Sequence, residues 1–438
     1  MKYGFLFIVF VVVSLAHLYA QTNNHPAELF QQQNYAEVIN ACNGLIAFEP
    51  QNFEAWYYKG LAEQALYRFN EASASLRQAV EFTQQKEPVL FTLGTILESD
   101  GNDEEAIKVY QKLLSIDSLH IPAKARLAKI NKDQKEYLHA ADYYSQLVKH
   151  DSMNSFFYGE LAYCCQKMGL IPPATEYYQK ALSLNPTNLK TGRQFISMLV
   201  DAKYYDVALA VIDTFLIQFP ENLHLLKQQA YIKAIGGNYL EAVNLFSHIV
   251  QLGDTSLFTS KYFGQSLYNN GQYHEAAYWL NKYLEAVPGD SKNQFILGLS
   301  YQNDYQYDKS LEHLTLAREQ LYPKELLSRI SAEMATTYTM YGTYCSYRDS
   351  LKTQTENYYK RAVDNYLEAL ELNPDDFTLY KKMGHLYEEN IKDNKVALYY
   401  YELYYKNLDS QKTTPLLLDW IQNKIRHLKE EMHFSGYE

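Results

Sequence analysis

The 438-residue sequence predicts an all-α fold, an α-solenoid superhelix of about eleven helix-turn-helix units of 34 residues with a C-terminal capping helix. Three observations predict it: small side chains recur every 34 residues, larger apolar side chains recur at the same step four positions further on, and the apolar spacing inside each unit is helical. The small residues are Ala106, Ala140, Ala174, Ala208, Ala242 and Ala276. The larger residues are Tyr110, Tyr144, Tyr178, Ile212, Phe246 and Leu280.

Each unit shows two helical patterns separated by a turn residue such as Gly169. In the unit around it, Leu161, Ala162 and Cys165 share one face of a first helix, and Ala174 and Tyr178 share one face of a second. Proline closes many units because it cannot continue a helix. The predicted second helices are 35–48, 70–82, 103–116, 137–150, 171–184, 205–218, 239–252, 273–286, 307–321, 357–372 and 394–406.

The N-terminus, MKYGFLFIVFVVVSLAHLYA, has a basic start, a short apolar run and a small residue before polar QTNN. This pattern is typical of a secretory signal peptide, and the run is short for a membrane span. We therefore expect a signal peptide at 1–20, a solenoid at 21–410 and a capping helix at 413–432, with no integral membrane span after cleavage. An uncleaved N-terminal anchor is the alternative.

Two places break the 34-residue step. Between the ninth and tenth second helices the register jumps by 52, so 18 residues are inserted and the unit at 323–374 is enlarged. The insertion forms either an extended helix pair or a protruding loop, and it is either a tolerated surface feature or a partner-contacting element. The eleventh unit slips by one residue at IKDNKVALYYYELYY.

The adjacent cysteines Cys164 and Cys165 and the pair Pro172–Pro173 are structural in this scheme. Cys165 takes the place of a leucine in sister units, and the two prolines fall at the start of a second helix, where the missing N–H is tolerated. No further Cys or His stands at ligand spacing, so we expect no metal site.

Composition and motifs exclude several classes of function. The formal charge of −11 argues against a nucleic-acid binder, because phosphate contacts need a basic face. The sequence contains no G-x-S-x-G, P-loop or H-E-x-x-H motif. We therefore predict no catalytic residue, no cofactor and no enzyme activity.

The repeat resembles the tetratricopeptide repeat, a 34-residue helix-turn-helix with small residues at fixed places. The matching positions are Trp56, Gly60, Phe69 and Ala72 in the second unit, and Leu161, Ala162, Gly169, Ala174, Tyr178, Ala181 and Pro186 in the fifth. The resemblance covers nearly all of the chain after residue 20. It implies a superhelix whose first helices line a concave groove that binds protein segments.

In the resembled family, the groove-lining positions are the one three residues before the small residue of the first helix, and those three before and four after that one. Applied here, this rule gives the candidate groove residues Lys190, Arg193, Lys227, Tyr231, Lys261, Gln265 and Lys292. Arg193, Lys227 and Lys261 are 34 apart, so the pattern predicts a basic row for an acidic peptide. A chance coincidence of exposed cations is the other interpretation.

The N-terminal units carry apolar side chains at the same positions, among them Tyr57, Leu61, Phe91, Thr95, Phe156 and Tyr163. These side chains either anchor a partner or pack within the superhelix.

The functional prediction is a non-catalytic scaffold or adaptor, exported to the periplasm or outer cell envelope of a Gram-negative bacterium. It binds a protein or peptide partner, and no nucleic acid. The alternatives are a sensing or regulatory ectodomain held by an uncleaved anchor and a glycan-binding accessory factor.

Overall fold

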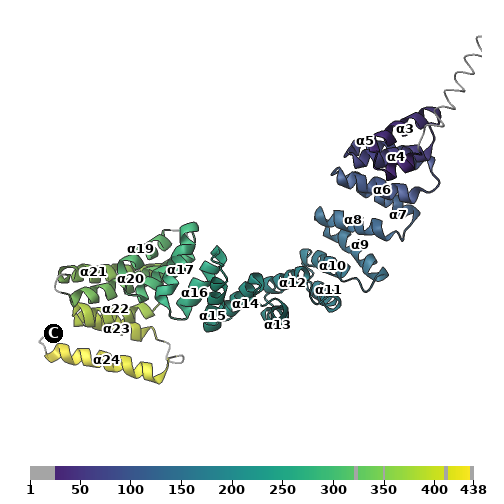
Figure 1. Ribbon diagram of the computed structural model, residues 1–438. Helices are drawn as coiled ribbons and strands as arrows, with labels where there is room; N and C mark the ends of the chain where they lie inside the picture. The colour runs from purple at the N-terminus through teal and green to yellow at the C-terminus, as the bar shows by residue number, and fades with distance from the viewer. Residues whose placement is uncertain (1–24, 320–323, 349–350, 409–412, 435–438) are drawn as a thin grey trace, which may run out of the picture. The chain divides into compact units, whose positions relative to one another are not determined.

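The computed structural model describes residues 25–319, 324–348, 351–408 and 413–434, and every regular element in those ranges is a helix (Figure 1). The chain divides into two compact units, one ending at Val211 and the other beginning at Ile212. The predicted all-α repeat architecture is confirmed. The predicted signal peptide at 1–20 lies outside the described residues.

The first unit is a succession of helix pairs in which a first helix is followed by a second. Its helices are α2 (Pro26–Gln31), α3 (Tyr35–Phe48), α4 (Phe53–Ala65), α5 (Phe69–Phe82), α6 (Lys86–Ser99), α7 (Asp103–Ile116), α8 (Ile121–Asp133), α9 (Tyr137–His150), α10 (Ser155–Lys167), α11 (Ile171–Leu184), α12 (Leu189–Asp201) and the start of α13 (Tyr205–Gln218).

The second unit continues the alternation and then departs from it. Its helices are α14 (Leu223–Ile235), α15 (Tyr239–Gln251), α16 (Leu257–Asn269), α17 (Tyr273–Ala286), α18 (Ser291–Asn303), α19 (Tyr307–Arg318), α20 (Lys324–Ser346), α21 (Lys352–Leu372), α22 (Thr378–His385), the π-helix η1 (Leu386–Ile391), α23 (Asn394–Lys406) and α24 (Pro415–Phe434).

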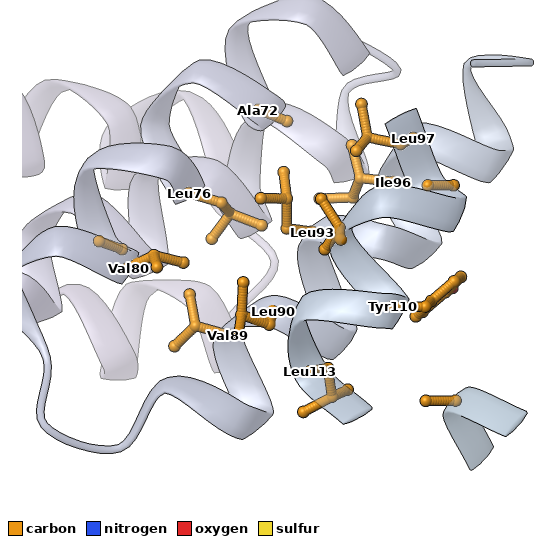
Figure 2. Packing of buried hydrophobic residues seen from close by; sticks show 14 of the residues in the cluster. Ala72, Leu76, Val80, Val89, Leu90, Leu93, Ile96, Leu97, Tyr110 and Leu113 are labelled. Carbon is orange, nitrogen blue, oxygen red and sulfur yellow. The ribbon is translucent and has the colours of Figure 1, made fainter. Parts of the chain in front are cut away.

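The two 34-residue ladders form the core. All six alanines of the first ladder have no exposed surface, and the six larger residues of the second are at most 2% exposed. A glycine in several first helices admits the larger residue of its partner helix. A Cβ on Gly264, for instance, would lie 2.8 Å from Leu280 Cγ. Figure 2 shows such a layer, where side chains of α5 and α6 such as Leu76 and Leu93 meet in one cluster.

The turn between the two helices of a pair has one backbone conformation in the nine regular pairs, from α2–α3 to α18–α19. Residues 33, 67, 101, 135, 169, 203, 237, 271 and 305 all have φ between 59° and 83°. Only four of these residues are glycine, although glycine adopts positive φ at least cost. Around Gly169, the Leu170 N–H donates to the Cys165 carbonyl at 2.9 Å, which closes the first helix. The repeat therefore fixes this conformation even where a side chain makes it costly.

The first helices form the more closely spaced row within each unit. Contacts between helices two apart in the chain join first helices, α10 to α12 in the first unit and α14 to α16 and α16 to α18 in the second. Closer spacing on one side bends a stack of helix pairs toward that side. First helices are thus the elements best placed to line a groove.

The 18-residue insertion is an extended helix pair: α20 continues to Ser346 and α21 begins at Lys352. The one-residue slip in the next unit is taken up by the π-helix η1, which follows α22 directly. After η1 the chain turns at Lys392, where φ is 67°. Helix α24 lies beside α23 (Figure 1). Ile421 and Leu428 of α24 are fully buried in a cluster with Tyr401 of α23.

The cysteines and prolines have the structural roles that the sequence predicts. Cys164 is fully buried and Cys165 is 6% exposed, and both are free thiols. Burial raises the pKa of Cys164 to about 12, so the thiol stays protonated at neutral pH. Pro172 and Pro173 stand in the first turn of α11.

Candidate functional site

The sequence-predicted groove residues all lie on first helices, distributed over both units. Lys190 and Arg193 lie on α12 in the first unit, whereas Lys227 and Lys261 lie on α14 and α16 in the second. The predicted basic row consists of Arg193, Lys227 and Lys261. That these three residues share one continuous surface stays a prediction.

In the first unit, Lys190 is held by a buried carboxylate. Its Nζ lies 2.9 Å from Glu160 Oε1, and the other oxygen of Glu160 lies 2.7 Å from Lys132 Nζ. Burial alone would raise the pKa of Glu160, but the hydrogen bonds from Lys132 and Lys190 outweigh it, so the pKa is lowered. One carboxylate therefore joins α8, α10 and α12, the first helices of three successive pairs.

Lys227 is held in the same way in the second unit. Its Nζ lies 2.8 Å from Asp254 Oδ2, in the turn before α16. Asp254 also accepts hydrogen bonds from Ser256 and Thr259. Burial would raise the pKa of Asp254, but the hydrogen bonds from these three donors outweigh burial. The pKa therefore falls below its usual value.

Lys261 repeats the arrangement one pair later. Its Nζ lies 2.9 Å from Asp290 Oδ2, which also accepts from the Tyr283 hydroxyl at 2.8 Å. Asp290 caps α18 through the Asn293 N–H. Burial would raise the pKa of Asp290, but these partners, Lys261 foremost, lower it to about 2. Lys227 and Lys261 are thus already neutralised by carboxylates of the following pair.

The remaining predicted residues differ in their surroundings. The Tyr231 ring centroid lies 4.8 Å from that of Tyr262, in an edge-on arrangement. Gln265 Nε2 donates to Asn293 Oδ1 at 2.7 Å. Lys292 is exposed on α18 and forms no ion pair with any described residue. Tyr231 and Gln265 therefore help to join α14, α16 and α18, and Lys292 faces solvent.

The aromatic residues at the groove positions of the first unit differ in how much they are buried. The Phe91 ring lies 6.0 Å from that of Tyr110, a core residue, and Tyr163 lies 6.3 Å from Tyr137. Phe156 is 54% exposed. Phe91 and Tyr163 contribute to packing, and Phe156 offers apolar surface to solvent.

A pocket of about 460 Å³ opens between α20 and α22, two successive first helices of the second unit. Its lining residues are Thr336, Thr339, Met340, Tyr366, Thr378, Lys381, Lys382, His385, Leu386 and Tyr404. We call it the α20–α22 pocket. Two tyrosines from second helices line it together with three threonine side chains and three side chains that are, or can become, cationic.

The cations of the α20–α22 pocket are not neutralised as Lys227 and Lys261 are. Lys381, Lys382 and His385 are exposed and form no ion pair within the described part of the chain. Lys381 Nζ lies 4.8 Å from the ring centroid of Trp420 on α24. Such a cluster can accept a carboxylate or a phosphate.

The repeat pattern of the sequence also marks this pocket. The predicted groove residues end at Lys292, but the same rule extends to later units. Continued to the small residues Gly342 and Gly384, it gives Thr336, Thr339, Thr343, Thr378, Lys381 and His385. All of these except Thr343 line the α20–α22 pocket. Lys382 is not at a position that the rule gives, so its place in the pocket could be found only from the structure.

The described residues contain no group of three His, Cys, Asp or Glu side chains arranged to hold a metal ion. Within the same residues, no helix is both long enough and apolar enough to cross a bilayer.

Comparisons with known proteins agree with the repeat architecture. Residues 87–118 and 157–188 match the family model described as tetratricopeptide repeat. The chain is 23% identical to tetratricopeptide repeat protein 37 of Xenopus laevis over 300 residues, which is 66% of this chain and 18% of that protein. The chain therefore spans about a fifth of the length of this relative.

Two solved structures are also similar. A tetratricopeptide repeat protein from Parabacteroides merdae has a TM-score of 0.40 at 16% identity, covering 59% of this chain and 95% of that chain. YrrB, described as a TPR protein with an unusual peptide-binding site, has a TM-score of 0.39 at 19% identity, covering 46% of this chain and 95% of its own.

Proposed function

The chain is a tetratricopeptide repeat protein, and on that premise we propose that it is an exported adaptor that holds an acidic protein segment in the α20–α22 pocket. Repeats of this family generally form scaffolds for protein–protein interaction rather than active sites. The chain is a protein-interaction scaffold in this general sense. The partner's acidic character, the binding position and the compartment are the proposal.

One observation carries the proposal: the cations of the α20–α22 pocket have no carboxylate partner among the described residues. The full chain has 40 Lys and Arg against 51 Asp and Glu, so carboxylates are in excess. Lys227 and Lys261 have recruited such carboxylates from the next pair. Lys381, Lys382 and His385 remain available for a carboxylate supplied by a partner.

A protein segment suits this pocket better than a nucleic acid does. The threonine hydroxyls and the side chains of Met340, Leu386 and Tyr404 offer hydrogen bonds and apolar contact beside the cations. A nucleic-acid site would need a basic surface along many phosphates, and the net charge of −11 opposes one. The partner that fits is a segment in which Asp or Glu alternates with apolar residues.

The proposed compartment is the cell envelope, and it rests on the apolar N-terminal segment of the sequence. Mass spectrometry of the chain purified from its native cell, together with osmotic-shock fractionation, tests it. A chain shortened by about twenty residues and released with the periplasm supports export. A full-length chain that stays with the membranes supports the anchored regulatory ectodomain instead.

The binding test is affinity capture from the native envelope followed by direct titration with the captured segment. We expect Lys382→Glu combined with His385→Glu to weaken binding at least tenfold, because a lysine and an imidazole are replaced by carboxylates facing an acidic ligand. Lys395→Glu, an exposed lysine on the second helix α23, is the matched control and leaves binding unchanged. Equal binding by the two variants would contradict the proposed pocket.

A further variant separates a local pocket from a long groove. Lys292→Glu changes an exposed lysine at a predicted groove position two pairs earlier. If the partner also follows the predicted row, this change weakens binding as well. If the partner is confined to the α20–α22 pocket, it does not.

A further inference from the structure

The two departures from the 34-residue step meet at one cavity. The cavity has a volume of about 570 Å³ and lies in the second unit between α21, lengthened by the insertion, and the π-helix η1, which takes up the one-residue slip. Its lining residues are Lys352, Thr355, Glu356, Tyr359, Lys360, Val363, Tyr387, Asn390 and Ile391. We call it the α21–η1 cavity. It shares no lining residue with the α20–α22 pocket.

The helix bounds explain why this space is open. The lining residues of α21 follow one another at steps of three, one, three, one and three, which places them on one face of the helix. The first of them, Lys352, stands five residues before the start of the second helix that the repeat predicts. The facing element ends at Ile391 and the chain turns away at Lys392. The first turns of α21 therefore project past the end of their neighbour.

The cavity is held in shape by hydrogen bonds between the inserted pair and the π-helix. Asn390 Nδ2 donates to Thr343 Oγ1 at 2.9 Å and to the Tyr359 hydroxyl at 3.3 Å. The Tyr387 ring is stacked on Tyr400, with centroids 5.6 Å apart. Tyr359 is only 8% exposed. Such fixed side chains give a preformed site, and π-helical turns inside α-helices frequently occur at functional sites.

The walls combine an apolar floor with unused polar groups. Tyr359, Val363 and Ile391 supply apolar surface. The Oγ1 atom of Thr355 is buried and has no hydrogen-bond partner in the described part of the protein. A buried hydroxyl without a partner is unusual and is costly to leave unpaired. It points to a ligand atom that accepts or donates a hydrogen bond there.

The rim of the cavity offers a cation to an anionic ligand. Lys360 is exposed and forms no ion pair with the described residues. Lys352 also lines the cavity, but it already has an interaction partner, and Glu356 adds a negative charge one turn before Lys360. A carboxylate on an apolar body can pair with Lys360 and accept a hydrogen bond from the Thr355 hydroxyl.

We propose that the α21–η1 cavity binds a small carboxylate whose body is aromatic or branched aliphatic. The volume lies within the range of small-molecule sites, which are mostly apolar with few placed polar groups. The site goes beyond the proposed scaffold function, because it takes a different class of ligand at a different place. The same chemistry is presented by a free acid and by the carboxyl end of a polypeptide with an apolar last residue.

The test is calorimetric titration of the full chain with three probes of one shape, 3-phenylpropionate, 3-phenylpropionamide and 3-phenylpropylamine. We expect the acid to bind at least tenfold more tightly than the amide and the amine. Equal or tighter binding of the amine would overturn the assignment of an anion site.

Three substitutions locate the bound acid. Lys360→Met and Thr355→Val each weaken acid binding about tenfold, because each removes one partner of the carboxylate. Glu356→Gln strengthens it several-fold, because it removes a repelling charge at the rim. Lys382→Met, which removes a lysine from the α20–α22 pocket, is the control and leaves acid binding unchanged.

Two peptide probes distinguish the source of the carboxylate. Gly-Gly-Phe with a free carboxyl end is compared with the same peptide amidated at that end. Binding by the free-ended peptide and not by 3-phenylpropionate identifies a polypeptide end, and the reverse identifies a free acid. If neither binds, or if Lys360→Met and Thr355→Val leave binding unchanged, the proposal is wrong whatever the partner capture shows.

Discussion

Two regions of the second unit use lysines at the same repeat position in opposite ways. In the regular pairs, Lys227 and Lys261 are bound to Asp254 and Asp290 of the following pair. In the pair that follows the enlarged unit, Lys381 occupies the corresponding place three residues before the small residue, yet it contacts the ring of Trp420 and no described carboxylate. One position of the repeat thus fastens neighbouring pairs in one region and faces a pocket in the other.

The difference teaches that the neighbour, and not the lysine, decides the role. An aspartate in the turn before the next first helix forms an ion pair with the lysine, and this ion pair joins two neighbouring helix pairs. The Lys227 side chain is 23% exposed and its aspartate 15%, so their attraction is screened less than that of a fully exposed pair. Where the neighbour offers an aromatic ring, the charge stays available.

The largest effect that tests this comparison is expected from Asp290→Ala. The substitution removes the partner of Lys261, the acceptor of the Tyr283 hydroxyl and the cap of α18. We expect the free energy of unfolding to fall by about 2–3 kcal/mol, measured by urea denaturation. Asp290→Asn keeps an acceptor for the cap and loses less. A loss no larger than that of Lys382→Ala would remove the distinction between the two regions.

The second effect is a pH dependence. The folded-state pKa of Asp290 is about 2, below its ordinary value, so its carboxylate stabilises the fold above the unfolded-state pKa. We expect a contribution of about 2 kcal/mol, complete above about pH 5 and lost as the pH falls toward 2. The difference in unfolding free energy between the native chain and Asp290→Asn should shrink over this interval. A constant difference would show that the Asp290 charge does not stabilise the fold.

The third effect concerns the contact between the enlarged unit and η1. Asn390→Ala removes both hydrogen bonds that join η1 to the inserted helix pair. We expect a loss of about 1–2 kcal/mol and faster amide hydrogen exchange in the first turns of α21. Asn303→Ala is the control, because Asn303 bonds only a carbonyl of its own helix, and it should change stability by less than about 0.5 kcal/mol.

The smallest effects compare the lysines themselves. Lys227→Ala leaves Asp254 without its cation and should cost about 1 kcal/mol. Lys382→Ala should change stability by less than about 0.5 kcal/mol, because no described ion pair is broken. Thermal unfolding of both variants at one ionic strength measures the difference. Equal losses would mean that Lys382 also has a structural tie.

The sequence predicted most of the fold because the repeat step constrains it many times over. The ladders of alanines and of larger apolar residues predicted the buried faces. The helices α3, α7, α9, α11, α13, α17 and α23 have the predicted bounds. α21 begins at Lys352 instead of 357, because the inserted residues extend the helix rather than forming a loop. In the sequence, the π-helix showed only as a one-residue slip of the repeat. Such a slip can be accommodated by a longer loop or by a π-helical turn, so it did not predict the π-helix.

The candidate site was less predictable. A repeat position indicates which face of the helix a residue lies on, but it does not indicate which side chains the residue contacts. The rule placed Lys190, Lys227 and Lys261 on first helices, but only the structure showed that Glu160, Asp254 and Asp290 neutralise them. The α20–α22 pocket follows from the same rule continued to Gly384. The α21–η1 cavity follows from no rule, because it depends on how far two helices project past one another.

The repeat pattern in the sequence was enough to predict stacked helix pairs, because small and large side chains that recur at a fixed step can be buried in few other ways. Which lysines form ion pairs within the molecule and which face a pocket became known only from the packed helices. The physical reason is that an ion pair or a cavity depends on distances of a few ångströms between residues far apart in the chain, and side-chain periodicity does not specify those distances.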